Sequence, residues 1–280
     1  MSQRVFNKVQ IGVEATKGTA VAATKILSGA EIRPIPNDRK PTFPEDSIGV
    51  RGQYSRGPYF YEYLVKDSLR FPHGYFQTLP YLLSCALKGG VTPSEVTPAQ
   101  GDYLWDFTPS MTASNAQKSL TIEKGDDTQA YEEEYVQFEK IRISGEISQT
   151  GEASPVIVEA EYYGRQETDT TFTGSLSPLG VETMNAKLAK FYIDATWANR
   201  LTTLKSGLLR AFEIEILTGM HAAFDGDANR YFTSGKEGMI AAMAALTFQR
   251  GALSDTERDV FKAGTQQAIG IKIEGSQIGT

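Results

Sequence analysis

Residues 156–163 read VIVEAEYY, and this stretch decides the fold class because it alternates along its length. Apolar side chains occupy the even positions from 156 to 162, whereas Glu159 and Glu161 occupy odd positions between them. Successive side chains of a β-strand point to opposite faces. The pattern therefore predicts a half-buried strand with both carboxylates on its exposed face.

The same period of two recurs in segments spread over the whole chain. These segments share an apolar residue at alternate positions, and they are 9–13, 141–148, 188–195, 212–216 and 269–273, with 120–122 beginning another. Half-buried strands joined by polar turns are typical of antiparallel sheets. We therefore expect a mainly β fold: an antiparallel β-sandwich or barrel-like domain with one or two short flanking helices, long loops and an N-terminal arm.

Two short helices are expected beside these strands. Ser254 and Glu257 have the spacing of a capping box, and Gly264 is placed to end a helix over about 254–263. A second helix is predicted over roughly 78–88, where apolar residues line one face before a Gly-Gly pair. The run GMIAAMAAL from Gly238 fits a buried helix or a buried strand equally well.

Stretches rich in turn-forming residues divide the chain. We expect long loops near 33–58, 91–118 and 218–235. Residues 1–30 are expected to form an N-terminal arm with the first strand, and residues 31–280 a single β-rich domain. Loops of this length are uncommon in a compact domain, and they suit contacts with neighbouring subunits.

Composition excludes several classes of protein. The chain has 280 residues, 40% of them hydrophobic, and a net charge of −6, which disfavours tight binding to nucleic acid or to an anionic membrane. Its single cysteine, Cys85, forms no intrachain disulfide and is expected to be buried. Neither a signal peptide nor a membrane helix is evident, so we expect synthesis in the cytosol and no membrane partner.

No motif for catalysis, a cofactor or a metal emerges. His73 and His221 lie at ligand spacing neither with each other nor with Cys85. The segment from Asp225 begins like a calcium loop, but Arg230 replaces the turn glycine, and Lys236 replaces the closing carboxylate. We therefore expect no enzymatic activity, no catalytic residue, no cofactor and no metal site.

The acidic residues fall into two groups. Asp126, Asp127 and the run 132–134 are interpreted as a solvated loop. Glu159 and Glu161, like Glu213 and Glu215, share one face of their strand because they are two residues apart. Such pairs can perform acid–base chemistry, but their recurrence on two strands, with Glu146 on a third, favours an acidic surface.

The segment 9–24, VQIGVEATKGTAVAAT, resembles the opening of the tail tube proteins of long-tailed bacteriophages. Further similarity lies in the stretches 120–127, 162–174, 207–219 and 247–274, so that the resemblance covers most of the chain outside 33–101. It implies a β-sandwich subunit that assembles into hexameric rings stacked as a tube in the virion. It also implies assembly in the bacterial cytoplasm with a tape-measure protein, a tail terminator and distal tail or baseplate proteins, and passage of double-stranded DNA through the channel without specific binding.

On this hypothesis the acidic strand faces line the channel, because an acidic wall does not hold a polyanion. The channel-lining candidates are Glu146, Glu159, Glu161, Glu213 and Glu215. The N-terminal segment is expected to contact the adjacent ring, and its candidate residues are Val9, Ile11, Val13, Glu14, Thr16 and Thr19.

Three alternatives remain open. The aromatic cluster at 59–63 fits a carbohydrate-binding or host-recognition β-sandwich of a phage tail, although aromatic residues in strands are more often core or cross-strand pairs. A tail terminator or neck protein of the same fold is the second. A hydrolase that uses a carboxylate pair is the third.

Overall fold

The computed structural model describes residues 7–31, 39–42, 59–96, 103–226 and 229–276. Strands dominate these residues, and all pairings between the strands described are antiparallel. The prediction of a mainly β, antiparallel fold with two short helices is therefore confirmed. None of the helices in these ranges combines the length and apolar character needed to cross a membrane.

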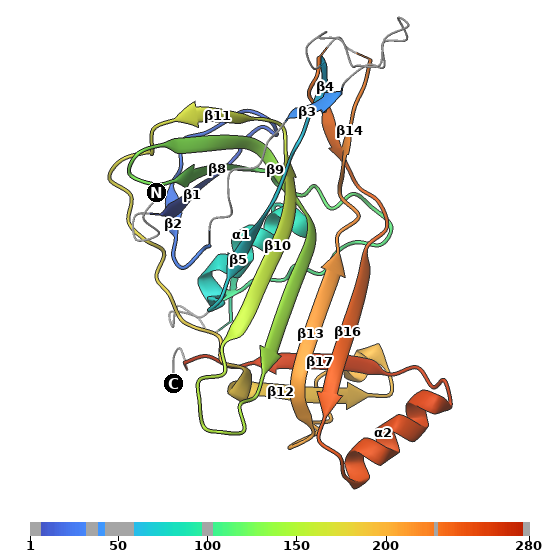
Figure 1. Cartoon of the computed structure of the whole chain (residues 1–280). Coiled ribbons are helices and arrows are strands. Elements are labelled where there is room, and N and C mark those ends of the chain that lie inside the picture. The colour runs from blue at the N-terminus through green and yellow to red at the C-terminus, as the bar shows by residue number, and fades with distance from the viewer. Residues whose placement is uncertain (1–6, 32–38, 43–58, 97–102, 227–228, 277–280) are drawn as a thin grey trace, which may run out of the picture.

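One nine-stranded sheet organises the molecule and branches at its longest strand, β9 (Ala130–Glu146), as Figure 1 shows. The first part of β9 pairs with β8 (Leu120–Gly125) and β11 (Glu167–Thr170). The second part pairs with β10 (Val156–Gly164) and β13 (Leu209–Leu217). Outer strands extend both parts: β1 (Lys8–Val13) and β2 (Lys25–Leu27) beyond β8, β5 (Val65–Phe71) beyond β10, and β16 (Ala241–Phe248) beyond β13.

The strand β9 changes partners at Tyr135, a non-glycine residue with a positive φ of 53°. A single residue in this conformation bends a strand and directs its two halves into different pairings. The run 132–134 therefore lies within β9, where Glu133 has an exposed fraction of 0%. The prediction of a solvated loop is wrong for these three residues and holds only for the turn at Asp126 and Asp127, which lies between β8 and β9.

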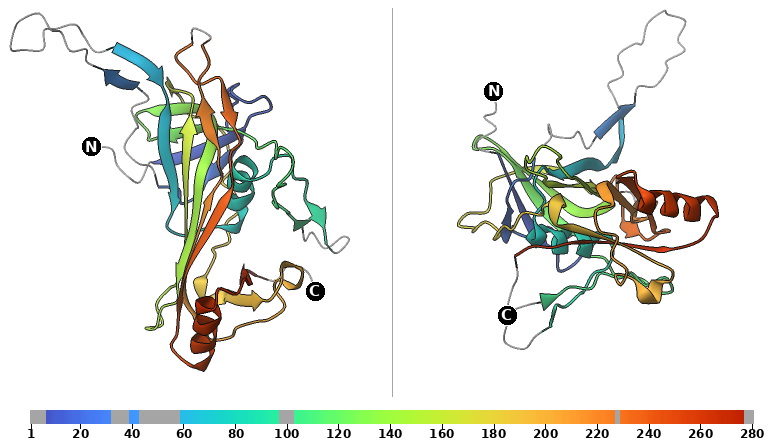
Figure 2. Two further views of the ribbon diagram at one scale, coloured as in Figure 1. Left: turned by 90° about the vertical axis from the view of Figure 1, so that its right-hand side faces the viewer. Right: turned by 90° about the horizontal axis from the view of Figure 1, so that it is seen from below.

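The main core joins residues of both parts of the sheet to α1 (Leu79–Ala86), which covers one side of the long strands in Figure 2. The inward residues of β10 predicted from the period of two are buried, with Val156, Val158 and Ala160 at 0% and Tyr162 at 1% exposure. Leu82 and Cys85 of α1 pack in the same cluster. The predicted helix at 78–88 and the buried cysteine are thus confirmed.

The second predicted helix forms as α2 (Ala252–Lys262), with one difference at its start. The cap is Gly251 rather than Ser254: the Gly251 N–H donates to Ser254 Oγ at 2.8 Å. Glu257 is consequently free for another role and pairs with Lys205 at 2.7 Å. Gly264 follows the helix with a φ of +68°, as a C-terminal stop requires.

Four small antiparallel pairs complete the described structure. They are β12 (Ala189–Asp194) with β17 (Ala268–Ile273), β14 (His221–Ala223) with β15 (Ser234–Lys236), β3 (Arg39–Thr42) with β4 (Tyr59–Tyr63), and β6 (Ser94–Glu95) with β7 (Tyr103–Leu104). The expected loops near 91–118 and 218–235 thus carry short strands. The expected loop near 33–58 lies outside the described residues except for β3. One turn of 3₁₀ helix at Phe76–Thr78 precedes α1, and two more lie at Ala186–Leu188 and Trp197–Asn199.

Candidate functional site

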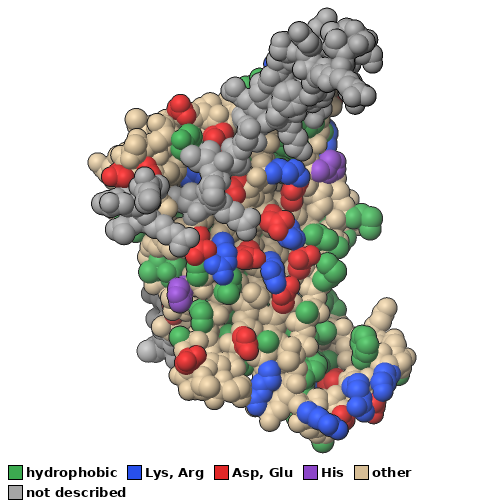
Figure 3. Space-filling model, in the orientation of Figure 1, with side chains coloured by type: hydrophobic (Ala, Val, Ile, Leu, Met, Phe, Trp, Pro, Cys, Tyr) green, Lys and Arg blue, Asp and Glu red, His purple; other side chains and the backbone are tan. Residues whose placement is uncertain are grey.

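The outward side of β5, β10, β9 and β13 presents a ladder of charged residues, visible as alternating red and blue at the centre of Figure 3. Strand register brings these residues together: Glu159 lies opposite Arg70 on one side and Arg142 on the other, and Arg142 lies opposite Glu215. We call this surface the charged face and define it by ten residues, namely Lys66, Arg70, Glu139, Lys140, Arg142, Glu146, Glu159, Glu161, Glu213 and Glu215.

Ion pairs cross the charged face from strand to strand. Arg142 lies 2.5 Å from Glu213 and 3.4 Å from Glu159, and Arg70 lies 2.9 Å from Glu159. In the neighbouring row Lys140 lies 2.7 Å from Glu161. The cations are therefore held by carboxylates of adjacent strands.

This arrangement corrects the expected acidic wall. The defining residues of the charged face carry six carboxylates and four cations, so the face is mixed in sign with an excess of two negative charges. The sequence already contained the signal, because Lys140 and Arg142 alternate with Ile141 and Ile143 on β9. Only the register revealed that these cations lie between the glutamates.

Electrostatics reinforce the ladder. The hydrogen bond from Arg142 lowers the pKa of Glu213 below its ordinary value. The hydrogen bonds that Arg70 donates to Glu31 and Lys140 donates to Glu161 raise the pKa values of Arg70 and Lys140 respectively. These groups are therefore all charged at neutral pH.

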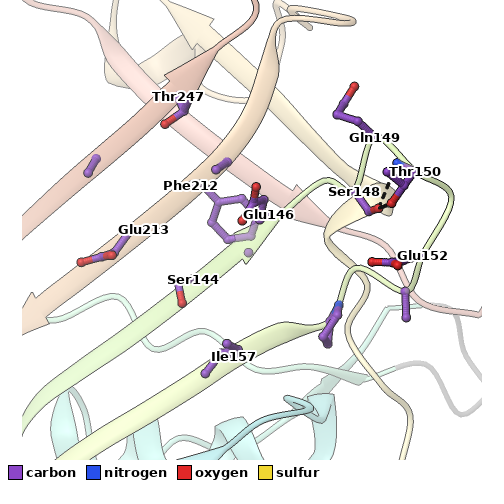
Figure 4. Close-up of a pocket in the computed structure, with 15 residues that line it drawn as sticks. Ser144, Glu146, Ser148, Gln149, Thr150, Glu152, Ile157, Phe212, Glu213 and Thr247 are labelled. Atoms are coloured by element: carbon purple, nitrogen blue, oxygen red, sulfur yellow. Dashed lines mark hydrogen bonds between the residues drawn. The ribbon is translucent and has the colours of Figure 1, made fainter.

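Glu146 lies at the end of β9, beside a hollow of about 760 Å³ in the charged face, shown in Figure 4. Ser144 on β9 and Glu213 on β13 line the same hollow, and the connection at 148–153 forms its far side. The structure thus brings all five channel-lining candidates onto one continuous surface.

One side of this sheet ends in an open strand, β16, which pairs only with β13 among the strands described. Both of its faces are exposed over residues 241–245, AAMAA, and Met243 has an exposed fraction of 55%. The run that fitted either a buried helix or a buried strand is thus an exposed edge strand. Such an edge presents unpaired backbone donors and acceptors for another chain.

In its described residues the N-terminal segment is part of the nine-stranded sheet rather than a free arm. β1 lies between β2 and β8, and Val9 and Ile11 are each 1% exposed. Glu14 is 2% exposed and accepts hydrogen bonds from the Gly18 N–H at 2.7 Å and the Tyr135 N–H at 2.8 Å. Its other donors are the hydroxyls of Ser119 at 2.5 Å and Thr121 at 3.1 Å.

These contacts correct half of the inter-ring prediction. Val9, Ile11 and Glu14 are buried in the interior of the chain itself, whereas Val13, Thr16 and Thr19 are exposed. Sequence reasoning missed the role of Glu14 because its donors lie up to 121 residues away in the chain.

The described side chains considered as metal ligands or catalytic groups do not come together in one place. Among the described residues no group of three or more His, Cys, Asp and Glu side chains is placed to hold a metal ion. His73 is exposed in a bend after β5, and His221 is exposed on β14. Burial raises the pKa of Cys85 to about 12. The calcium-like segment from Asp225 includes residues 227 and 228, which lie outside the described ranges. The side chains of 59–62 in the aromatic cluster do so as well.

A scan against protein-family models and a search of curated proteins find no match to this chain. The resemblance to tail tube proteins therefore remains a prediction, and the geometry described above is the basis for assigning a function.

Proposed function

We propose that this chain is the structural subunit of a bacteriophage tail tube, assembling as hexameric rings that stack around a channel for DNA ejection. The observation that carries the proposal is the open apolar edge at β16 beside an ordered charged face. A monomer that functions alone rarely leaves a long edge strand uncovered, because such edges promote aggregation. In the assembled ring the exposed edge of β16 forms the contact with the next copy of the chain.

Edge contact joins copies head to tail. The five-stranded part of the sheet runs β5-β10-β9-β13-β16, so its two edges are different strands on opposite sides. A contact between unlike surfaces is heterologous, and it closes into a ring when the rotation per subunit divides a full turn. Hexameric closure is the order that the family resemblance implies.

The charged face lines the channel in this proposal. Its excess of carboxylates repels phosphate groups, and its four cations are already engaged by glutamates of other strands. A cation held in an ion pair gains little from counterion release on DNA, because it would have to leave its carboxylate. DNA therefore slides along this surface rather than adhering to it.

The remaining assignments follow from the same proposal. The partners are other copies of the chain, a tape-measure protein, a tail terminator and distal tail or baseplate proteins, and the location is the virion. Stacking of rings uses exposed segments at their rims, including Val13, Thr16 and Thr19.

Negative-stain electron microscopy of the purified protein tests the proposal. We expect hollow filaments of uniform diameter, or rings at low concentration. A protein that stays monomeric over the full accessible concentration range, with and without tail extracts, would contradict it.

A further inference from the structure

A second cluster of charges lies inside the protein, apart from the charged face. It consists of Lys124 on β8, Asp67 on β5, Glu133 on β9 and Tyr162 on β10. The exposed fractions of the first three side chains are 3%, 7% and 0%, and that of Tyr162 is 1%. Four strands from both parts of the branched sheet thus direct polar groups to one buried point.

The atoms of this cluster are in close contact. Lys124 Nζ lies 2.6 Å from Asp67 Oδ2 and 2.6 Å from Glu133 Oε1. Tyr162 Oη donates to Glu133 Oε2 at 2.5 Å. The lysine nitrogen therefore contacts an oxygen that is bonded to the Asp67 carboxyl carbon, and a second carboxylate lies beside it.

Burial and neighbouring charges act in opposite directions in this cluster: burial lowers the pKa of Lys124, but Glu133 and Asp67 outweigh it and raise that pKa above its ordinary value. Taking ions out of water is costly, and a buried ion pair repays that cost only with very good geometry. Burial raises the pKa of Glu133, although Lys124 opposes this, so Glu133 is a ready acceptor for a lysine proton. Burial also raises the pKa of Tyr162 well above 10, so that its hydroxyl remains a donor.

We propose that Lys124 and Asp67 condense to an intramolecular isopeptide bond, with Glu133 as the proton carrier. Glu133 takes one proton from the ammonium group and passes it to an Asp67 carboxyl oxygen. The neutral Nζ attacks Cγ, the N–C bond forms, and the C–O bond to the protonated oxygen breaks. Of the three ammonium protons one stays on the amide nitrogen, and two leave with that oxygen as water.

The product removes two buried charges and joins distant parts of the chain. The amide N–H is left beside Glu133, which accepts from it, and β8 becomes covalently tied to β5. The chain has one cysteine, so it has no disulfide available for the same purpose. The bond forms within one copy and does not depend on the proposed tube.

Intact-mass spectrometry of the folded wild-type protein is the decisive experiment. We expect a mass lower than the sequence mass by one water molecule. Tryptic digestion should yield a branched peptide that joins Asp67 to Lys124, with no cleavage after Lys124. The full sequence mass in a protein that is folded by circular dichroism overturns the proposal.

Two variants and an internal control sharpen the result. Glu133→Gln retains the size of the side chain but cannot carry the proton, so we expect the full mass; a linked Glu133→Gln protein refutes the role of Glu133. Asp67→Asn releases ammonia instead of water, and its linked product has the same mass as linked wild type.

Lys140 and Glu161 lie 2.7 Å apart at the surface and are expected to remain unlinked, because water stabilises their charges.

Discussion

Arg142 donates a hydrogen bond to Glu213 across the boundary between β9 and β13, with 2.5 Å between Nη2 and Oε2. The same guanidinium reaches Glu159 on β10 at 3.4 Å. One cation thus connects three strands of the charged face. The surface that the proposal places inside the channel is therefore an ordered lattice of paired charges, and its net sign can be changed without altering the core.

Reversing the acidic residues of this face tests its role in DNA passage. Exposed ion pairs contribute about 0.2–1 kcal/mol each, so replacing Glu159, Glu161, Glu213 and Glu215 by lysine should leave folding and tubes intact. The lysines should retain double-stranded DNA and slow its release, with retention falling steeply as salt rises. The matched control replaces the same residues by glutamine. Unchanged DNA release, or loss of folding, would count against the assignment.

Placing charge on the open edge tests assembly. Met243→Lys and Ala244→Lys together put a cation on each face of β16, and both positions are already exposed. Substitutions at such sites usually change stability by no more than about 0.5 kcal/mol, whereas edge lysines block pairing between sheets. We expect a folded monomer in sedimentation experiments. Met111→Lys, at a residue 80% exposed in a loop, is the control, and filaments from the double variant would refute the role of β16.

Removing the Glu14 carboxylate separates an internal role from an inter-ring role. Glu14→Ala leaves buried donors without partners, and each such group costs about 1–3 kcal/mol. We expect a loss of about 3 kcal/mol or more in the free energy of unfolding, measured in urea. Thr16→Ala, at an exposed neighbour, should change stability little. Normal stability of Glu14→Ala with tubes shortened to single rings would restore the inter-ring interpretation.

The same geometry predicts the outcome of an N-terminal deletion. Loss of residues 1–24 removes β1 from between β2 and β8 and opens the core at Val9 and Ile11. We therefore expect an unfolded or aggregated product rather than soluble rings, which circular dichroism and gel filtration distinguish.

Asp194 makes stability depend on pH at acid values. Burial alone raises the pKa of Asp194, but hydrogen bonds from Thr203 and Thr202 outweigh it, and the pKa lies below its ordinary value. The stabilising contribution is complete above the unfolded pKa of about 3.9 and is lost as pH falls through the lower folded value.

Urea denaturation at a series of acid pH values measures this dependence. Asp194→Asn should be less stable than wild type at neutral pH, and the difference should shrink toward the acid end. Asp169→Asn, at an exposed position on β11, is the control. A constant difference between wild type and Asp194→Asn at all pH values would contradict the expectation.

The sequence by itself determined many of the strands and which side chains share a face within each of them, although it assigned 132–134 to a loop and left 241–245 undecided between helix and strand. The alternation at 156–163 placed Val158 and Ala160 inward and Glu159 and Glu161 outward, because successive side chains of a strand point to opposite sides. Local signals also placed both helices, since apolar spacing and glycine stops act within a few residues. These features depend on the backbone of one segment and need no information about its neighbours.

Only the tertiary structure decided which residues lie next to each strand face. Arg142 lies between two glutamates because of the register of β9 with β10 and β13. Glu14 is buried among donors that lie far away in the chain, from Ser119 to Tyr135. The apolar run at 241–245 lies at an edge because β16 pairs with β13 on one side and with no described strand on the other. Strand order and register arise from contacts between residues far apart in the chain. Alternation of apolar and polar residues in one strand does not indicate which other strand pairs with it.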